Sequence, residues 1–143
     1  MHDKEKLEEN KKLVLNFQLA VAKQLQGEPQ VSIAHHLSDD ITWYLPESVN
    51  TLADGHIKQG KTNVLRLFDD IVKRFYDPNT MQFDFHGLFA AEDKVHFHFT
   101  LSAITNSGKT YQSGYQMLFQ VDNGQIKNVW EYFDSALLLR QSQ

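Results

Sequence analysis

The stretch that decides the fold of this chain is residues 94–134, which read KVHFHFTLSAITNSGKTYQSGYQMLFQVDNGQIKNVWEYFD. Apolar and polar side chains alternate in it, as they do along strands that have one buried face. Asn106-Ser107-Gly108 and Asp122-Asn123-Gly124 interrupt the alternation with residues that are typical of tight turns. We therefore expect three antiparallel strands joined by hairpins, over residues 94–105, 110–122 and 125–134.

Two more strands are predicted upstream of this stretch. Residues 81–90 are rich in Phe and are separated from the strand at 94 by Glu92-Asp93. A strand with an aromatic face is expected where Ile41, Trp43 and Leu45 alternate with polar neighbours, and Pro46 ends it. Ser38-Asp39-Asp40 is interpreted as a turn before this strand.

Helices are expected before and between these strands. Residues 5–26 carry apolar side chains at spacings of three and four, and Gly27 follows them. A shorter helical turn is predicted from Glu28-Pro29 through Val31 and Ala34 to Leu37, and a third helix from Gly60 to Phe75. A final helical turn is expected over 135–143.

Helices followed by a run of antiparallel strands are typical of the α+β class. We expect a cone-shaped, curved antiparallel (mixed) sheet wrapped around the long N-terminal helix and the third helix, in one domain over residues 1–143. The open end of such a cone is the expected ligand site.

The composition excludes several classes of function. The 14 Lys and Arg against 18 Asp and Glu give a net charge of −4, so no basic field favours nucleic acid. There is no cysteine, which excludes disulfides, thiolate metal sites and a Cys nucleophile. No signal-peptide pattern or apolar run of about 20 residues occurs, so a cytoplasmic protein that does not enter membranes is expected.

The order of elements, with Trp43-Tyr44-Leu45-Pro46 and Gly124-Gln125-Ile126, resembles the nuclear-transport-factor-2-like superfamily. Within it the chain is most similar to the SnoaL-like polyketide cyclase group, through Asp122 to Ile126 followed by Val129-Trp130-Glu131 and Asp134. The resemblance covers nearly the whole chain. The superfamily includes isomerases, dehydratases, epoxide hydrolases, cyclases and proteins without enzyme activity, so the fold alone names no function.

Two of these reactions do not fit the residues. Ketosteroid isomerases need a carboxylate before the proline that ends the first strand and a tyrosine on the first helix. This chain resembles them in both places but carries Leu45 where the carboxylate is needed and Phe17 where the tyrosine is needed. Epoxide hydrolases of the superfamily place an arginine between two aspartates. The arginines here are Arg66, Arg74 and Arg140, which are expected on the third helix and in the tail.

The histidines are expected on the outer face of the sheet. Val95, Phe97 and Phe99 make the apolar face of their strand, so the alternating His96 and His98 point away from it. His86 is assigned to the same polar set, on a strand whose apolar residues include Phe83, Phe85 and Phe89, and a metal site is not expected there. We predict a homodimer through this face, by way of His96, His98, Thr100 and Gln112.

Glu131 is the candidate catalytic residue. In SnoaL-like relatives the acid that follows the tryptophan of this motif lies in the pocket, and burial there would raise its pKa toward neutrality. The alternation also permits an outward Glu131 with Trp130 and Tyr132 buried, and the sequence leaves both arrangements open.

The resemblance implies a small hydrophobic molecule as ligand and an isomerase, cyclase or dehydratase type of acid–base reaction on a carbonyl compound. The alternative is a non-catalytic ligand-binding or dimerisation module. No cofactor is expected, because no Gly-rich phosphate loop follows a strand. The expected pocket residues are Phe17, Trp43, Leu45, Phe68, Val72, Phe97, Phe99, Tyr115, Met117, Val129 and Phe133.

Overall fold

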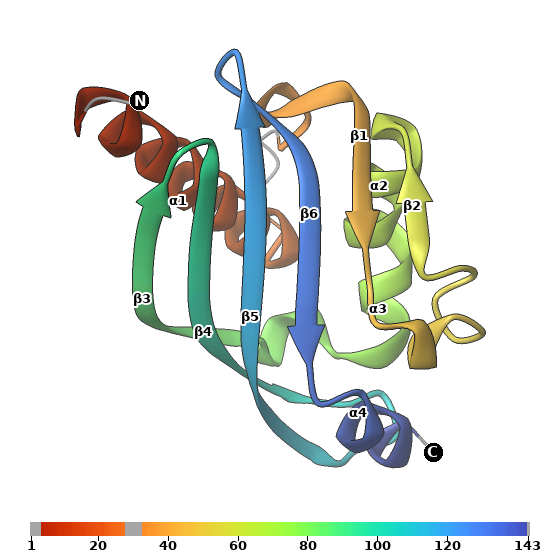
Figure 1. Cartoon of the computed structure of the whole chain (residues 1–143). Coiled ribbons are helices and arrows are strands. Elements are labelled where there is room, and N and C mark those ends of the chain that lie inside the picture. Colours follow the sequence, from red (N-terminus) through yellow and green to blue (C-terminus); the bar gives the residue numbers. More distant parts are fainter. Residues whose placement is uncertain (1–3, 28–32, 143) are drawn as a thin grey trace.

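The computed structural model describes residues 4–27 and 33–142 (Figure 1). Its helices are α1 (Lys4–Leu25), α2 (Lys61–Arg66), α3 (Val72–Phe75) and α4 (Ser135–Gln141), and a π-helical stretch η3 (Leu67–Ile71) joins α2 to α3. Short 3-10 turns are η1 (Ala34–His36), η2 (Glu47–Val49) and η4 (Pro78–Thr80). The strands are β1 (Leu37–Tyr44), β2 (Ile57–Gln59), β3 (Gln82–Ala91), β4 (Lys94–Ile104), β5 (Thr110–Asp122) and β6 (Gln125–Phe133).

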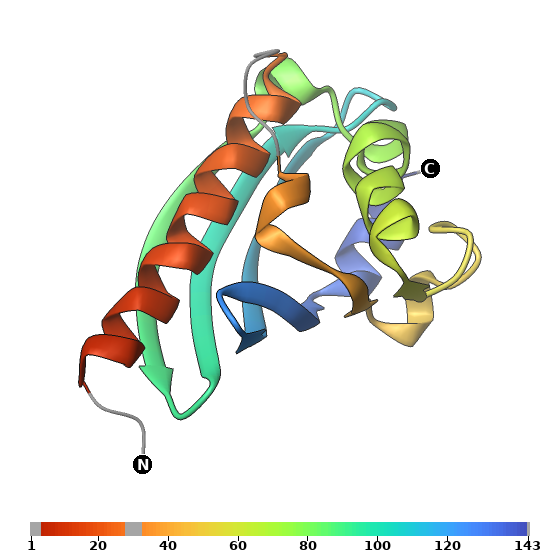
Figure 2. The same ribbon diagram turned by 90° about the horizontal axis from the view of Figure 1, so that it is seen from above.

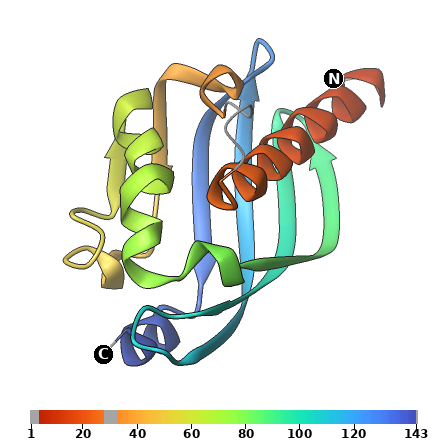
Figure 3. The ribbon, with the colours of Figure 1, turned by 180° about the vertical axis from the view of Figure 1, so that it is seen from behind.

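The strands form one mixed sheet in the order β2-β1-β6-β5-β4-β3. Among the strands of the described residues, only β1 and β6 pair in parallel, and every other neighbouring pair is antiparallel. The sheet is strongly curved and is not closed into a barrel (Figure 2). Seen from behind, α1 and the α2–α3 segment both lie against the same side of it (Figure 3). The expected α+β architecture is confirmed.

The hairpin between β5 and β6 combines a tight turn with a shift in register. Asn123 and Gly124 both have positive φ, at 49° and 74°, as a two-residue hairpin turn of the primed type requires. Beyond the turn the pairing shifts by one residue between Gln120 and Val121, and it then runs to Met117 opposite Glu131 and Tyr115 opposite Phe133. The turn and this shift together determine which residues of β6 face the helices.

Helix α1 supplies one wall of the interior. Its buried residues include Val14, Phe17, Val21 and Leu25, at spacings of three and four. Phe17 packs against the rings of Trp43, Phe68 and Phe119, with centroids about 6 Å apart. The core thus lies between α1, the α2–α3 segment and the concave face of the sheet.

The prediction for the start of β1 was wrong. The strand begins at Leu37, which was expected to end a helical turn, and Asp39 and Asp40 lie within the strand. The pairing with β6 shifts register between Leu37 and Thr42, so the two aspartates occupy an irregular, exposed stretch that looks like a turn in the sequence. The predicted restart at Glu28-Pro29 lies outside the described residues, and strand β2 was not predicted.

A second irregularity changes the faces of β3. The pairing with β4 shifts between Phe85 and Gly87, and beyond this bulge the alternation of side chains is reversed. Phe85 packs against Phe97, whereas Phe89 stacks on His96 with ring centroids 4.7 Å apart. The assignment of Phe89 to the same face as Phe85 was therefore wrong, because the bulge next to Gly87 adds one residue to the alternation.

Candidate functional site

A cavity of about 90 Å³ lies between the concave face of the sheet and the two helical segments. Most of the side chains that line it are aliphatic or aromatic. Nitrogen or oxygen atoms are carried by five of the lining side chains, those of Gln18, Trp43, Tyr76, Tyr115 and Glu131. Such a wall, apolar with a few polar groups, is typical of small-molecule sites.

The structure brings most of the expected pocket residues to this cavity. Those in its lining, beside Glu131, are Trp43, Leu45, Phe68, Val72, Phe99, Tyr115, Met117 and Phe133. Phe17, Phe97 and Val129 are buried but do not line it. Phe17 is fully enclosed by other aromatic rings, and Phe97 packs between Phe85 and Phe99. Strand parity places Phe97 and Val129 on the inner face, and the helical spacing places Phe17 on the buried side of α1, but neither pattern decides which of them reach the cavity.

Glu131 points into the cavity. Val129, two residues before it, is fully buried, and Tyr132 is 59% exposed on the opposite face. Trp130 stacks on Tyr44, with ring centroids 5.5 Å apart and nearly parallel planes. Of the two arrangements that the alternation permits, the structure therefore has the one with the carboxyl inward.

Trp43 holds the Glu131 carboxyl in place. The indole Nε1 donates a hydrogen bond of 2.8 Å to Glu131 Oε1. Burial raises the pKa of Glu131 to about 7, although the hydrogen bond from Trp43 acts in the opposite direction and lowers it. A carboxyl with a pKa near 7 has substantial populations of both its acid and its base form at neutral pH.

Three tyrosine hydroxyls form a buried chain beside the carboxyl. Tyr115 Oη lies 2.7 Å from Tyr111 Oη and 3.1 Å from Tyr76 Oη. Burial raises the pKa of all three phenols, and the charge of Glu131 raises them further. Tyr76 and Tyr111 were not predicted. Tyr111 could have been predicted, because it lies four residues before Tyr115 on the same face of β5. No pattern in the neighbouring sequence links Tyr76 to these two residues.

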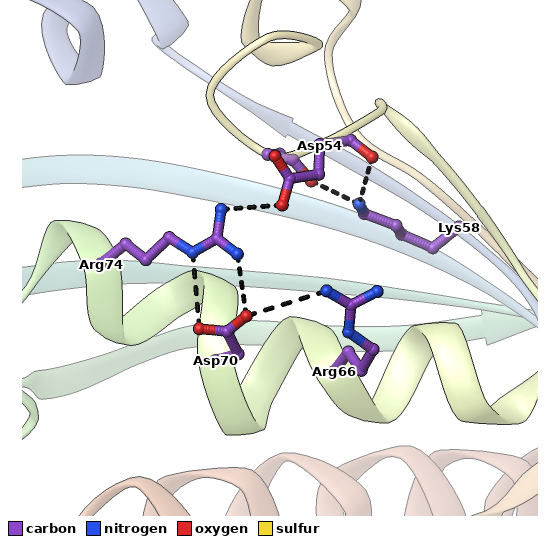
Figure 4. A network of polar contacts seen from close by, with 6 residues as sticks. Asp54, Lys58, Arg66, Asp70 and Arg74 are labelled. Carbon is purple, nitrogen blue, oxygen red and sulfur yellow. Dashed lines mark hydrogen bonds and ion pairs between the residues drawn. The ribbon is translucent and has the colours of Figure 1, made fainter.

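The segment between β1 and β2 closes one side of the cavity through Val49 and Ala53. Figure 4 shows how charged groups hold this segment. Arg74 Nη1 contacts Asp54 Oδ2 at 2.8 Å, and Arg74 Nη2 contacts Asp70 Oδ2 at 2.8 Å. Lys58 Nζ donates to the carbonyl oxygens of Ala53 and Asp54. The network thus ties the segment to the α2–α3 helix, and Arg66 adds a contact of 3.9 Å with Asp70.

Residues 26–129 match the family model described as the SnoaL-like domain. The chain belongs to the SnoaL-like family. Glu131 lies just beyond the matched range, at the end of the strand that the match enters. A comparison with curated protein sequences finds no match.

Solved structures similar to this SnoaL-like chain support the fold. A nuclear-transport-factor-2-like protein of unknown function from Burkholderia pseudomallei has a TM-score of 0.78 at 17% identity, over 94% of this chain and 98% of that one. A protein from Jannaschia provisionally assigned as a SnoaL-like polyketide cyclase has a TM-score of 0.77 at 11% identity, over 99% and 96%. TerC, co-crystallised with polyporic acid, has a TM-score of 0.75 at 16% identity, over 93% and 97%.

The histidines of the SnoaL-like sheet lie outside the cavity. His86 Nε2 is 2.6 Å from Thr100 Oγ1, and His96 Nε2 is 2.9 Å from Gln116 Oε1. The rings of His86 and His98 are 5.0 Å apart. Within residues 4–27 and 33–142 no three acidic or histidine side chains are grouped so that they could hold a metal ion. The homodimer through His96, His98, Thr100 and Gln112 stays a prediction.

Among the helices of the described part of the chain, none has the length and apolar character needed to span a bilayer.

Proposed function

We propose that this SnoaL-like chain binds a small hydrophobic molecule in its cavity and that Glu131 exchanges a proton with it. The observation that carries the proposal is the carboxyl of Glu131, with a pKa of about 7, in a largely apolar cavity. A group that is half ionised at neutral pH both accepts and returns a proton efficiently. The reaction is of the isomerase or cyclase type and uses no cofactor.

The simplest such reaction moves a hydrogen that lies next to a carbonyl. The Glu131 carboxylate takes the proton from carbon, and the electron pair of the C–H bond shifts to make an enolate. The neutral Glu131 then returns its proton to the same or another carbon of the enolate. The group leaves the reaction in its starting form, so the step balances without a second reactant.

The size of the cavity limits the ligand. At about 90 Å³ it is well below the roughly 300 Å³ at which drug-sized sites begin. A single ring with few substituents is therefore the expected ligand of the cavity in this conformation. The co-crystallisation of the structurally similar TerC with polyporic acid supports the view that this fold admits ring compounds.

Deuterium exchange tests the proposal without knowledge of the natural substrate. Cyclic and aryl ketones are incubated with the protein in deuterated buffer, and exchange next to the carbonyl is followed by NMR. The wild-type chain is expected to accelerate exchange for at least one ketone, and Glu131→Gln to lose about 100-fold or more of that acceleration. The matched control is Glu92→Gln, which changes an exposed carboxyl. A Glu131→Gln variant that keeps the wild-type rate contradicts the proposal.

The alternative is a non-catalytic module that only holds an apolar ligand, and the predominance of apolar side chains in the cavity wall favours it. It predicts that Glu131→Gln leaves the affinity for a bound ketone nearly unchanged while Trp43→Ala weakens it. The same deuterium experiment then shows no acceleration with the wild-type chain. Affinity and exchange, measured on the same two variants, separate the two functions.

A further inference from the structure

The carboxyl of Glu131 has one oxygen with a hydrogen-bond donor and one without. Oε1 accepts the hydrogen bond of 2.8 Å from Trp43 Nε1. Within residues 4–27 and 33–142 no other group donates to the carboxyl, so Oε2 has no partner there. The side chain lines the cavity and is only partly covered. Oε2 is therefore available to a hydrogen-bond donor that a ligand carries.

The wall of the cavity supplies no positive charge to this carboxyl. Among the described side chains that line it there is no Lys, Arg or His, and beside Glu131 the titratable ones are Tyr76 and Tyr115. The hydroxyls of these two tyrosines and of Tyr111 bond to one another, and Tyr111 also bonds to Ser113. Burial and the charge of Glu131 raise the pKa of all three phenols, so they stay neutral. An ionised Glu131 is thus a negative charge in an apolar cavity without a cation beside it.

The aromatic rings of the wall favour one kind of cation over another. Tyr115 lies between Phe99 and Phe133 of the neighbouring strands, with ring centroids 5.2 and 4.7 Å away and stacked planes. Both faces of the Tyr115 ring are therefore covered. A quaternary ammonium is held mainly by exposed ring faces, whereas an ammonium with N–H groups also donates a charge-assisted hydrogen bond to a carboxylate. The available carboxylate oxygen favours the second kind.

We propose that the cavity binds a second class of ligand, a small hydrophobic amine, whose protonated nitrogen donates a hydrogen bond to Glu131 Oε2 while its hydrocarbon body packs against the apolar wall. The nitrogen supplies the positive charge that the wall lacks, and opposite charges attract more strongly where water is excluded. A neutral molecule of the same shape gains only the packing. The inference goes beyond the proposed function, because it uses the charge of Glu131 and involves no transfer of a proton from carbon.

The amine and a proton compete for Glu131. Because the ammonium pairs with the carboxylate and not with the neutral acid, its affinity rises as Glu131 loses its proton. With a pKa of about 7, Glu131 is about 1% ionised at pH 5 and about 90% ionised at pH 8, so the affinity is expected to rise about 100-fold. The amine itself stays protonated over this range, as a lysine side chain with a pKa of about 10.4 does.

Cyclohexylammonium and cyclohexanol test the inference, because they have nearly the same shape and differ in charge. Calorimetry measures both affinities at pH 5 and pH 8. The wild-type chain is expected to bind cyclohexylammonium at pH 8 and about 100-fold more weakly at pH 5, whereas its affinity for cyclohexanol does not rise with pH. Glu131→Gln is expected to bind the cation about tenfold or more weakly at pH 8 and cyclohexanol nearly as the wild type does. The matched control Glu92→Gln changes an exposed carboxyl and is expected to bind both probes as the wild type does.

The release of protons on binding gives a second readout, which needs no variant. At pH 6 about 90% of Glu131 is protonated, so each bound cyclohexylammonium is expected to release about 0.9 proton to the buffer, and about 0.1 proton at pH 8. Calorimetry in buffers with different enthalpies of ionisation measures this number. It decides the inference even where Glu131→Gln does not fold.

Each outcome decides the ammonium site separately from the proposed proton transfer. Binding of cyclohexylammonium with release of protons, but without deuterium exchange of any ketone, supports the site and contradicts the proposed function. Deuterium exchange without binding of cyclohexylammonium at pH 8 overturns the site and leaves the proposed function intact. An affinity for the cation that does not rise with pH, or that Glu131→Gln leaves unchanged, also overturns the site.

Discussion

The polar groups on the two sides of the cavity wall differ in what surrounds them. Inside, Glu131 has the indole of Trp43 as a hydrogen-bond donor, and burial moves its pKa to about 7. Outside, Arg74 contacts both Asp70 and Asp54, and its hydrogen bond lowers the pKa of Asp70 in solvent. Glu131 makes fewer charged contacts than Arg74. Its ionisation is nevertheless expected to change the free energy of unfolding more than the exterior ion pairs do, because water screens those pairs.

The strongest test of this difference is the pH dependence of stability. Glu131 has a raised pKa in the folded chain, so folding favours its neutral form. As the pH rises from about 4.5 to about 7, the unfolded chain loses this proton first, and the free energy of unfolding falls by about 3 kcal/mol. Glu131→Gln is expected to remove that decline and to be more stable than the wild type at pH 8.

Chemical denaturation at a series of pH values measures this effect. The control is again Glu92→Gln, which is expected to retain the wild-type decline because it changes an exposed carboxyl. An unchanged slope between pH 4.5 and 7 in Glu131→Gln would show that the interior carboxyl does not control the pH dependence.

A smaller effect is expected from removing the donor to Glu131. Trp43→Phe loses the indole N–H and leaves space beside the carboxyl, so stability falls by about 2 kcal/mol. Because the lost hydrogen bond lowers the pKa of Glu131, that pKa is expected to rise above about 7. The carboxyl ¹³C signal of Glu131 in a pH titration measures it.

Trp130→Phe is the matched variant for this experiment, since Trp130 stacks on Tyr44 on the opposite face of the sheet. It is expected to leave the titration midpoint of Glu131 in place. Equal midpoints in wild type and Trp43→Phe would mean that the indole does not influence the carboxyl.

The smallest effect is expected at the exterior network. Arg74→Gln removes the contacts with Asp54 and Asp70, so amide exchange in residues 46–56 is expected to become faster, by less than about fivefold. High salt is expected to produce a similar change in the wild type, because these charges are exposed.

Arg66→Gln tests whether the segment between β1 and β2, which contains the loop of residues 46–56, is held by the ion pair between Arg74 and Asp54 or only by positive charge on the α2–α3 helix. Arg66 contacts Asp70 at 3.9 Å but is not paired with Asp54. Loop exchange in this variant should equal that of the wild type. If Arg66→Gln and Arg74→Gln accelerate the loop alike, the pair between Arg74 and Asp54 is not what holds it.

The differences between expectation and structure have physical causes at particular residues. Alternation in β6 limited Glu131 to one of two faces, but the choice between them depended on packing that brings Trp43 to the carboxyl. Register shifts in β1 and β3 moved Asp39 and Phe89 away from their expected places. A bulge adds one residue to a strand, and alternation by itself does not show where that residue falls, although Gly87 inside β3 was a signal for one of the two shifts.

The sequence by itself determined the class of fold, because the alternation in residues 94–134 and the turn residues between them act over short distances along the chain. It also determined that a carboxyl stands in β6 with aromatic residues around it. The tertiary structure alone decided that Tyr76 meets Tyr115 and that Phe17 lies behind the cavity and not in its wall. Those contacts join segments that are distant in the chain, and they depend on how the helices pack into the curved sheet.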